Sequence, residues 1–80
     1  MTPISENILM LRRARRVLAN PNSLDVLSRG EIAMVAFALN RPEYLQQTGL
    51  TMSQALGRLE QFEIEAIEFA ARELHNPTIN

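Results

Sequence analysis

Side chains that could carry out covalent or metal chemistry are scarce among the 80 residues of this chain. Cysteine is absent, and the one histidine is His75. Nucleophilic catalysis needs a nucleophile, a base and an orienting acid, and metal sites in helical bundles use Glu-x-x-His pairs. Glu73 and His75 are only two residues apart, and the three glycines form no phosphate-binding loop. We therefore expect no enzyme activity, metal or cofactor, and we expect His75 to act as a cation near the end of its helix.

The highest concentration of charge is in residues 11–16, Leu-Arg-Arg-Ala-Arg-Arg. At about 100° per residue, Arg12, Arg13 and Arg16 point outward from a helix, with Leu9 exposed between them. Such a face can contact phosphates or an acidic protein surface, or it can pair with the chain's own glutamates. A dedicated nucleic-acid binder usually has a pI above about 9, whereas the pI of this sequence is near 5.7. The sequence therefore predicts a protein-binding face made of Leu9, Arg12, Arg13 and Arg16.

Opposite charges are separated along the chain. Residues 1–30 contain five arginines and two carboxylates, a net charge of +3, and residues 31–80 contain three arginines and seven glutamates, a net charge of −4. Most of those glutamates are expected on a solvated helix surface. Glu63 instead falls within the apolar stripe of its helix, and Arg15 lies at the edge of the stripe on the first helix. We predict an ion pair between Arg15 and Glu63 that fixes helix register, with a charged dimer contact as the alternative.

The elements that must carry these residues are predicted to be helices only. Hydrophobic residues recur with the helical period, and capping boxes at Ser28 and Thr51 mark two helix starts. Prolines at first helical positions and a stop at Gly49 give further boundaries. The predicted fold is one compact all-α domain over residues 1–80, with residues 76–80 as a frayed tail. Its four helices are expected at about residues 3–19, 29–39, 42–48 and 52–74.

The apolar pattern assigns a place to each helix. Residues 32–39 are apolar all round and are expected to form the central helix. A short turn before it should bring Leu24 and Leu27 into the core. The first helix is expected to bury Ile4, Ile8, Leu11, Ala14 and Leu18, widened by Met10 and Val17. The last helix is expected to bury Met52, Ala55, Leu56, Leu59, Phe62, Ala66, Ile67, Ala70 and Leu74.

The length of the last predicted helix favours a homodimer. A helix over residues 52–74 would be about 35 Å long, longer than the roughly 30 Å width of a compact domain of this size. An apolar stripe that overhangs the domain needs a partner. The residues predicted for self-association are Tyr44, Met52 and Ile64.

Residues 44–59 resemble a helix-turn-helix motif, with a short helix, a glycine turn and a capped second helix. The resemblance implies that Ser53, Gln54 and Arg58 would face the major groove of DNA. Several features depart from the motif: Leu56 stands where a polar residue is usual, Arg58 stands near a core position, Gly57 weakens the second helix, the glutamates that follow would repel phosphate, and no winged hairpin follows. An ordinary corner between two helices has the same spacing, so both interpretations stay open.

The chain has no apolar stretch that approaches the ~20 residues needed to cross a bilayer. Together with the absence of cysteine, this leads us to expect a cytoplasmic protein without membrane contact. We expect a small non-enzymatic regulator or inhibitor, of the accessory or phage-borne kind, that binds a protein partner and forms a homodimer. A DNA-binding transcription regulator that uses residues 44–59 is the alternative.

Overall fold

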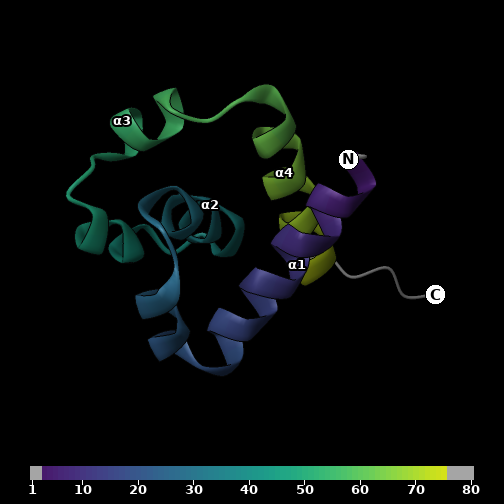
Figure 1. The fold of residues 1–80 in the computed structure, drawn as a ribbon, viewed down its shortest axis with the longest axis horizontal. Helices are drawn as coiled ribbons and strands as arrows, with labels where there is room; N and C mark the ends of the chain where they lie inside the picture. The colour runs from purple at the N-terminus through teal and green to yellow at the C-terminus, as the bar shows by residue number, and fades with distance from the viewer. Residues whose placement is uncertain (1–2, 76–80) are drawn as a thin grey trace.

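The computed structural model of the chain describes the backbone of residues 3–75 and the side chains of residues 6–75. All regular structure in that part is helical, which confirms the predicted all-α class (Figure 1). Two of the segments, labelled η, are tighter 3₁₀ helices. The predicted tail, residues 76–80, lies outside the described residues. In chain order the segments are α1 (Pro3–Ala19), η1 (Pro21–Val26), α2 (Arg29–Leu39), η2 (Pro42–Thr48), α3 (Met52–Gly57) and α4 (Gln61–His75).

Helix α2 forms the centre of the molecule, as predicted (Figure 1). Residues 32–39 are all buried except Phe37, which is half-buried, and α1, η2, α3 and α4 all contact this helix. The predicted capping box fixes its start. The Ser28 hydroxyl accepts the backbone N–H of Glu31 at 3.2 Å, and the Glu31 carboxylate accepts the backbone N–H of Ser28 at 2.9 Å. Asn40 ends the helix in the left-handed conformation at a φ of 56°, which asparagine tolerates better than most residues.

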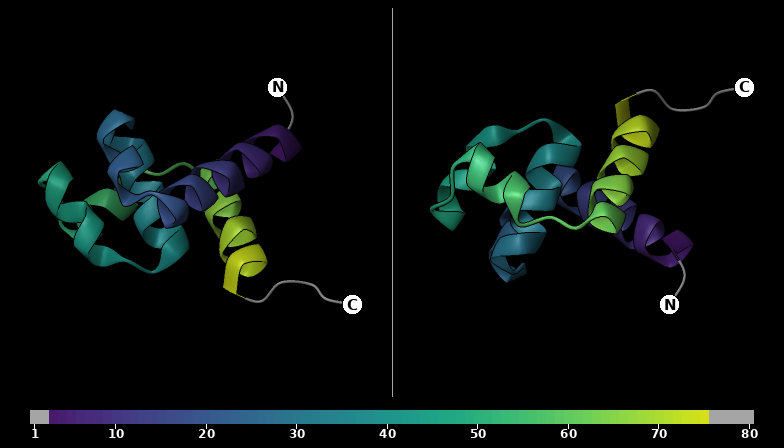
Figure 2. Two further views of the ribbon diagram at one scale, coloured as in Figure 1. Left: turned by 90° about the horizontal axis from the view of Figure 1, so that it is seen from below. Right: turned by 90° about the horizontal axis from the view of Figure 1, so that it is seen from above.

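Helices α1 and α4 cross and pack against each other at one end of the molecule (Figure 2). Together with α2 they form the main hydrophobic core. Leu24 of η1 is buried in the same cluster, and Leu27 packs against its edge, as the sequence predicted. The residues that α1 and α4 contribute to the buried cluster are Met10, Ala14, Val17, Ala66, Ile67 and Ala70.

Segments η2 and α3 cover the other side of α2 with a second, smaller cluster. The turn between them depends on Gly49, which has a φ of 74°, a conformation that glycine adopts without steric cost. Thr48 is buried before this turn. Its hydroxyl donates to the carbonyl of Leu45 at 2.6 Å and accepts the backbone N–H of Leu50 at 3.1 Å. The buried members of the cluster are Ala33, Ala36, Leu45 and Ala55.

The prediction of one helix over residues 52–74 is wrong, because the chain breaks between α3 and α4. Gly57, a poor helix former, ends α3, and the Arg58 backbone N–H bonds back to the last turn. A new helix start follows, where a Glu63 carboxylate oxygen accepts the Glu60 backbone N–H at 2.9 Å. The 15 residues of α4 extend about 22 Å, well within the 39 Å long axis of the molecule. The overhang that favoured a dimer therefore does not exist.

The break also changes which side chains the last helical region buries. Met52, Leu56 and Phe62 were predicted to lie in the core, but they are exposed at 55%, 53% and 43%. A helical stripe keeps its phase only while the helix is continuous, and α4 begins with a new phase. The predicted helix at residues 42–48 has the right bounds, but η2 is a 3₁₀ helix rather than an α-helix.

His75 joins the end of α4 to the end of α2. Its Nε2 lies 3.0 Å from the backbone oxygen of Ala38, a distance that suits donation from an Nε2–H group. Ala38 lies in the last turn of α2, where backbone carbonyls have no partner within the helix. His75 also lies in the last turn of its own helix, as predicted, but the sequence did not indicate this contact with α2.

Alanine substitutions at Gly49 and Gly57 should change stability in opposite directions. A Cβ atom at either position would meet nothing within 4 Å, so backbone conformation alone distinguishes the two sites. Gly49→Ala should lower the free energy of unfolding by about 1 kcal/mol or more, because its φ is positive. Gly57→Ala, at the last residue of α3 and without a positive φ, should raise it by about 0.4–1 kcal/mol. Urea unfolding followed by circular dichroism measures both, and effects of the same sign would contradict the turn geometry.

Candidate docking face on helix α1

Helix α1 is rotated about its axis relative to the sequence prediction. Met10, Ala14 and Val17 form its buried side. Ile8 and Leu18, which were predicted to be buried, are exposed at 42% and 49%. The helix has more apolar side chains than its contacts with α2 and α4 can cover, so packing decides which of them reach the core. Part of the predicted core stripe therefore faces solvent.

A charged residue within that stripe was the signal that the sequence analysis missed. On a helical wheel, Arg15 lies about 20° from Ile8 and about 40° from Leu11, which places it inside the stripe and not at its edge. Arginine is almost never fully buried without a partner, and Arg15 is exposed. Its position indicates that this side of α1 faces solvent, and it adds Ile8 and Arg15 to the exposed face.

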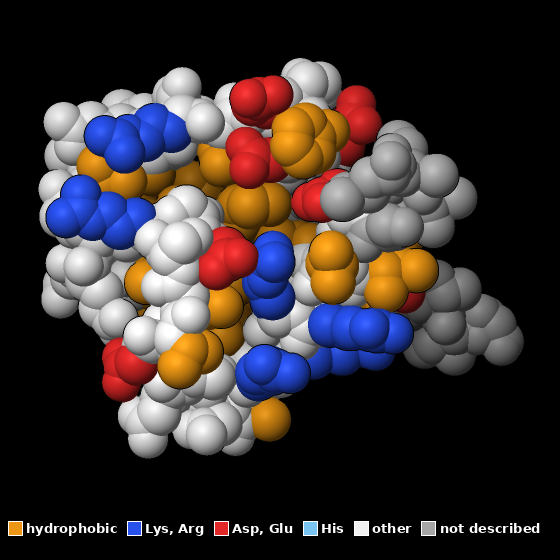
Figure 3. Space-filling view, in the orientation of Figure 1, with side chains coloured by type: hydrophobic (Ala, Val, Ile, Leu, Met, Phe, Trp, Pro, Cys, Tyr) orange, Lys and Arg blue, Asp and Glu red, His pale blue; other side chains and the backbone are white. Residues whose placement is uncertain are grey.

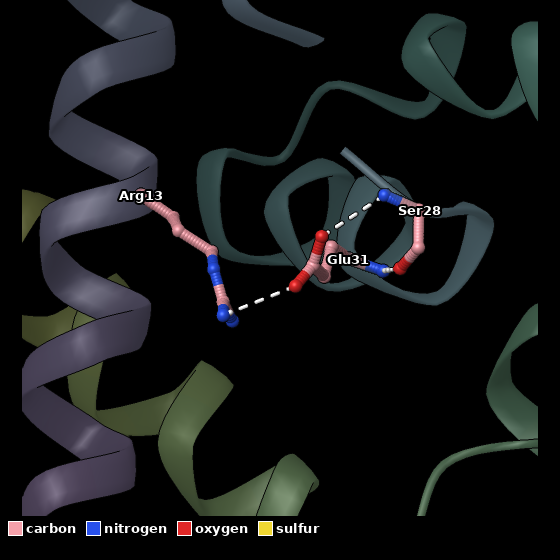
Figure 4. A network of polar contacts seen from close by, with 3 residues as sticks. All are labelled: Arg13, Ser28 and Glu31. Atoms are coloured by element: carbon pink, nitrogen blue, oxygen red, sulfur yellow. Dashed lines mark hydrogen bonds and ion pairs between the residues drawn. The ribbon is translucent and has the colours of Figure 1, made fainter. Parts of the chain in front are cut away.

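Arg13 points away from the exposed side and toward α2 (Figure 4). Its Nη2 atom lies 3.1 Å from Oε2 of Glu31, and both side chains are half-buried. The other carboxylate oxygen of Glu31 accepts the backbone N–H of Ser28. Arg13 thus fastens α1 to the capped start of α2. Because its charge already has a partner within the fold, we take Arg13 out of the predicted partner-binding set.

The solvent side of α1 combines apolar and basic side chains, and we name it the α1 docking face. Leu9, which was predicted to be exposed, has 38% of its surface accessible. Figure 3 shows arginine side chains beside apolar ones over α1, at the lower right of the view. All members of the α1 docking face are exposed: Ile8, Leu9, Arg12, Arg15 and Arg16.

The arginines of the α1 docking face form no ion pair with a carboxylate of residues 6–75. The ion pairs within that range are Arg13–Glu31 and Arg41–Glu43. The predicted pair between Arg15 and Glu63 is therefore wrong. Because α4 begins at Gln61, Glu63 stands in its first turn, where the carboxylate binds the Glu60 backbone N–H and serves as a cap.

The α1 docking face suits contact with an acidic protein surface. Guanidinium groups bind carboxylates with two parallel hydrogen bonds, and Arg12 and Arg16 are separated by about 6 Å along the helix axis. Ile8 and Leu9 lie one turn earlier and supply the apolar part of the contact. Arginine is enriched among the residues that dominate binding energy in protein interfaces.

The residues predicted for self-association do not have a common environment. Tyr44 is half-buried and packs against both hydrophobic clusters, so it serves the fold. Ile64 is also half-buried, because the new start of α4 turns it partly inward. Met52 remains exposed, with Leu56 one turn further along α3.

The residues predicted to contact DNA lie on or next to a very short helix. Ser53 and Gln54 are exposed on α3, which has six residues, and Arg58 directly follows it. Gln54 is engaged in the predicted capping box: its Oε1 accepts the Thr51 backbone N–H at 3.0 Å, and its own backbone N–H donates to Thr51 Oγ1 at 3.1 Å. The preceding segment, η2, is a 3₁₀ helix. In a helix-turn-helix protein the second helix lies in the major groove, and here α3 provides only six residues for that contact.

The remaining surface features of the described residues are modest. A shallow hollow lies on α4 beside Glu68, Ala71, Arg72 and His75. Within residues 6–75, histidine, aspartate and glutamate side chains form no group of three that could hold a metal ion. None of the described helices has both the length and the apolar character needed to cross a bilayer.

Comparison of the chain with protein-family models, curated proteins and solved structures gave no match. The α1 docking face is thus interpreted from the chain's own residues.

Arg13→Ala should destabilise the fold, whereas Arg12→Ala should leave stability almost unchanged. The first substitution removes the contact between α1 and Glu31, and we expect it to cost about 1 kcal/mol. The second removes an exposed side chain, for which changes within about 0.5 kcal/mol are normal. Urea unfolding of the two variants provides the comparison. Equal losses would show that Arg13 has no special structural role.

Proposed function

We propose that this protein is a small non-enzymatic binding module that docks on an acidic protein surface through the α1 docking face and regulates or inhibits the protein that it binds. One observation supports this more than any other. Ile8 and Leu9 are exposed beside three arginines, and these arginines have no ion-pair partner among the described carboxylates.

Binding would cover surface that the fold leaves accessible. Burying a Leu or Ile side chain completely is worth about 1.5–3 kcal/mol, so covering the exposed part of Ile8 and of Leu9 is worth about 1 kcal/mol each. The arginines add charge-assisted hydrogen bonds to carboxylates and determine which partner surface fits. The partner therefore needs at least two carboxylates beside an apolar hollow.

The helix that carries the α1 docking face is held in place before binding. The buried side of α1 packs against α2 and α4, and Arg13 ties the helix to Glu31. A helix that is already folded and positioned loses little conformational entropy on binding. This favours a module that presents a rigid helix face to a groove.

A protein partner fits this surface better than a nucleic acid. The α1 docking face has three arginines and no aromatic side chain on which a base could stack. The whole chain carries a net charge of −1, so much of its surface repels phosphate. The geometry around Ser53 and Gln54 gives no additional support for DNA binding.

Capture of a partner from a lysate of the producing cells should depend on the α1 docking face. Wild-type bait should retain a protein that Arg12→Glu/Arg16→Glu bait loses by about tenfold or more, because reversed charges repel the partner's carboxylates. The matched control is Arg41→Glu/Arg58→Glu, which changes the net charge equally at exposed arginines outside α1 and should retain the partner. Circular dichroism should show the same helix content in all three baits.

One further measurement separates this function from its alternative, and a second tests the electrostatic basis of the binding. Nuclease treatment before capture should not change the retained protein, and binding of the purified partner should weaken as salt is raised. Equal retention by both double variants would refute docking through α1. Loss of all bound protein after nuclease treatment would favour nucleic-acid binding instead.

A further inference from the structure

The opposite charges on α1 and α4 face outward and do not meet within one chain. The two helices pack through apolar sides, with Ala14 and Ala66 among the buried residues of their shared cluster. The arginines of the α1 docking face and the exposed glutamates of α4 therefore point away from the apolar contact between the two helices. We name Glu65 and Glu68 the α4 acidic face, and both are exposed.

The α4 acidic face matches the α1 docking face in charge and in spacing. Glu65 and Glu68 are separated by about 4.5 Å along the helix axis and about 60° around it, and Arg12 and Arg16 by about 6 Å and 40°. Helices that pack side by side can therefore bring two glutamates onto two arginines. Arg72, one turn after Glu68, limits the acidic run toward the end of α4.

An apolar side chain accompanies the glutamates. Phe62 lies one turn before Glu65 and is exposed, which gives Ile8 and Leu9 an apolar counterpart. Figure 3 shows that the basic side chains over α1 and the acidic side chains over the start of α4 lie on one side of the molecule. A two-fold axis that brings the α1 docking face of one copy onto the α4 acidic face of the other makes every contact occur twice.

We propose that a second copy of this chain covers the α1 docking face with its α4 acidic face, forming a two-fold dimer that hides this face until a partner displaces it. The proposal rests on the proposed function in that both use the same arginines. It adds a form of regulation, because dimer formation and partner binding compete for one surface. Since the contact is charged and small, the dimer should be reversible and sensitive to salt.

The dimer can be tested by reversing the charge of each face separately. Sedimentation velocity of the full chain over a range of concentrations should show a monomer–dimer equilibrium. Arg12→Glu/Arg16→Glu should weaken it by about tenfold or more, and so should Glu65→Arg/Glu68→Arg, because each variant places like charges opposite one another. Arg41→Glu/Arg58→Glu, which changes the net charge as much as the first variant does, should dimerise like the wild type.

A mixture of the two reversed variants gives the sharpest result. In a mixed dimer, the reversed α1 of one chain meets the reversed α4 of the other, and the two unaltered faces also meet. Both contacts then regain opposite charges, so equimolar mixing should restore dimers to within a few-fold of the wild-type affinity. Glu65→Arg/Glu68→Arg mixed with Arg41→Glu/Arg58→Glu controls for attraction between net charges. The second variant should form its own dimers in this mixture, and no more dimer should appear than it forms alone.

Each outcome bears on the dimer separately from the proposed function. A wild-type chain that stays monomeric at all concentrations overturns the dimer, and so do reversed variants that dimerise like the wild type or a mixture that stays monomeric. Partner capture that depends on Arg12 and Arg16 can still be observed in each of these cases. Conversely, rescue by mixing supports the dimer even when no partner is captured.

Discussion

The burial of α2 on every side is the constraint on which the rest of this structure depends. Its residues 32–39 include no polar side chain, so water must be excluded all round. Helices α1 and α4 cover one side and η2 with α3 covers the other. In a chain of 80 residues, covering α2 engages many of the apolar side chains of the other helices. The binding that we propose must therefore use side chains of the covering helices that are not buried against α2.

Helix α1 is the element with such a surplus. Met10, Ala14 and Val17 are enough to bury its inner side, and Arg13 adds a polar tie to Glu31. The α1 docking face keeps two aliphatic side chains and three arginines. The charges of α1 and α4 are kept apart for the same reason. The two helices contact each other through their apolar sides, so their charged sides point outward. The proposed docking surface and its electrostatic complement then occur on one chain, and the competition that we propose between partner and second copy follows from that arrangement.

Signals that act over a few residues were read correctly from the sequence. Both capping boxes, at Ser28 and Thr51, form as predicted, and Gly49 adopts the left-handed conformation expected of a helix stop. The bounds of α1, α2 and η2 follow from such signals. Each involves a side chain and a backbone group within four residues of each other, so the rest of the fold need not be known.

Apart from the local cap at Glu63, which was missed, the errors concern properties that depend on longer contacts. The stripe over residues 52–74 was consistent with one helix, but the cap that Glu63 provides and the packing of α3 on Ala33 and Ala36 favour two shorter ones. The rotation of α1 was equally ambiguous, because apolar residues occur on both of its sides.

The sequence by itself determined that this protein is all-helical, that α2 is central, that α1 is basic and that Leu9 and two flanking arginines are exposed. Only the tertiary structure decided that Arg13 belongs to the fold, that Ile8 and Arg15 belong to the exposed face, and that Arg15 and Glu63 do not meet. The physical reason is that helical periodicity places side chains around an axis, whereas the side of that axis that is buried depends on which neighbouring helices pack against it.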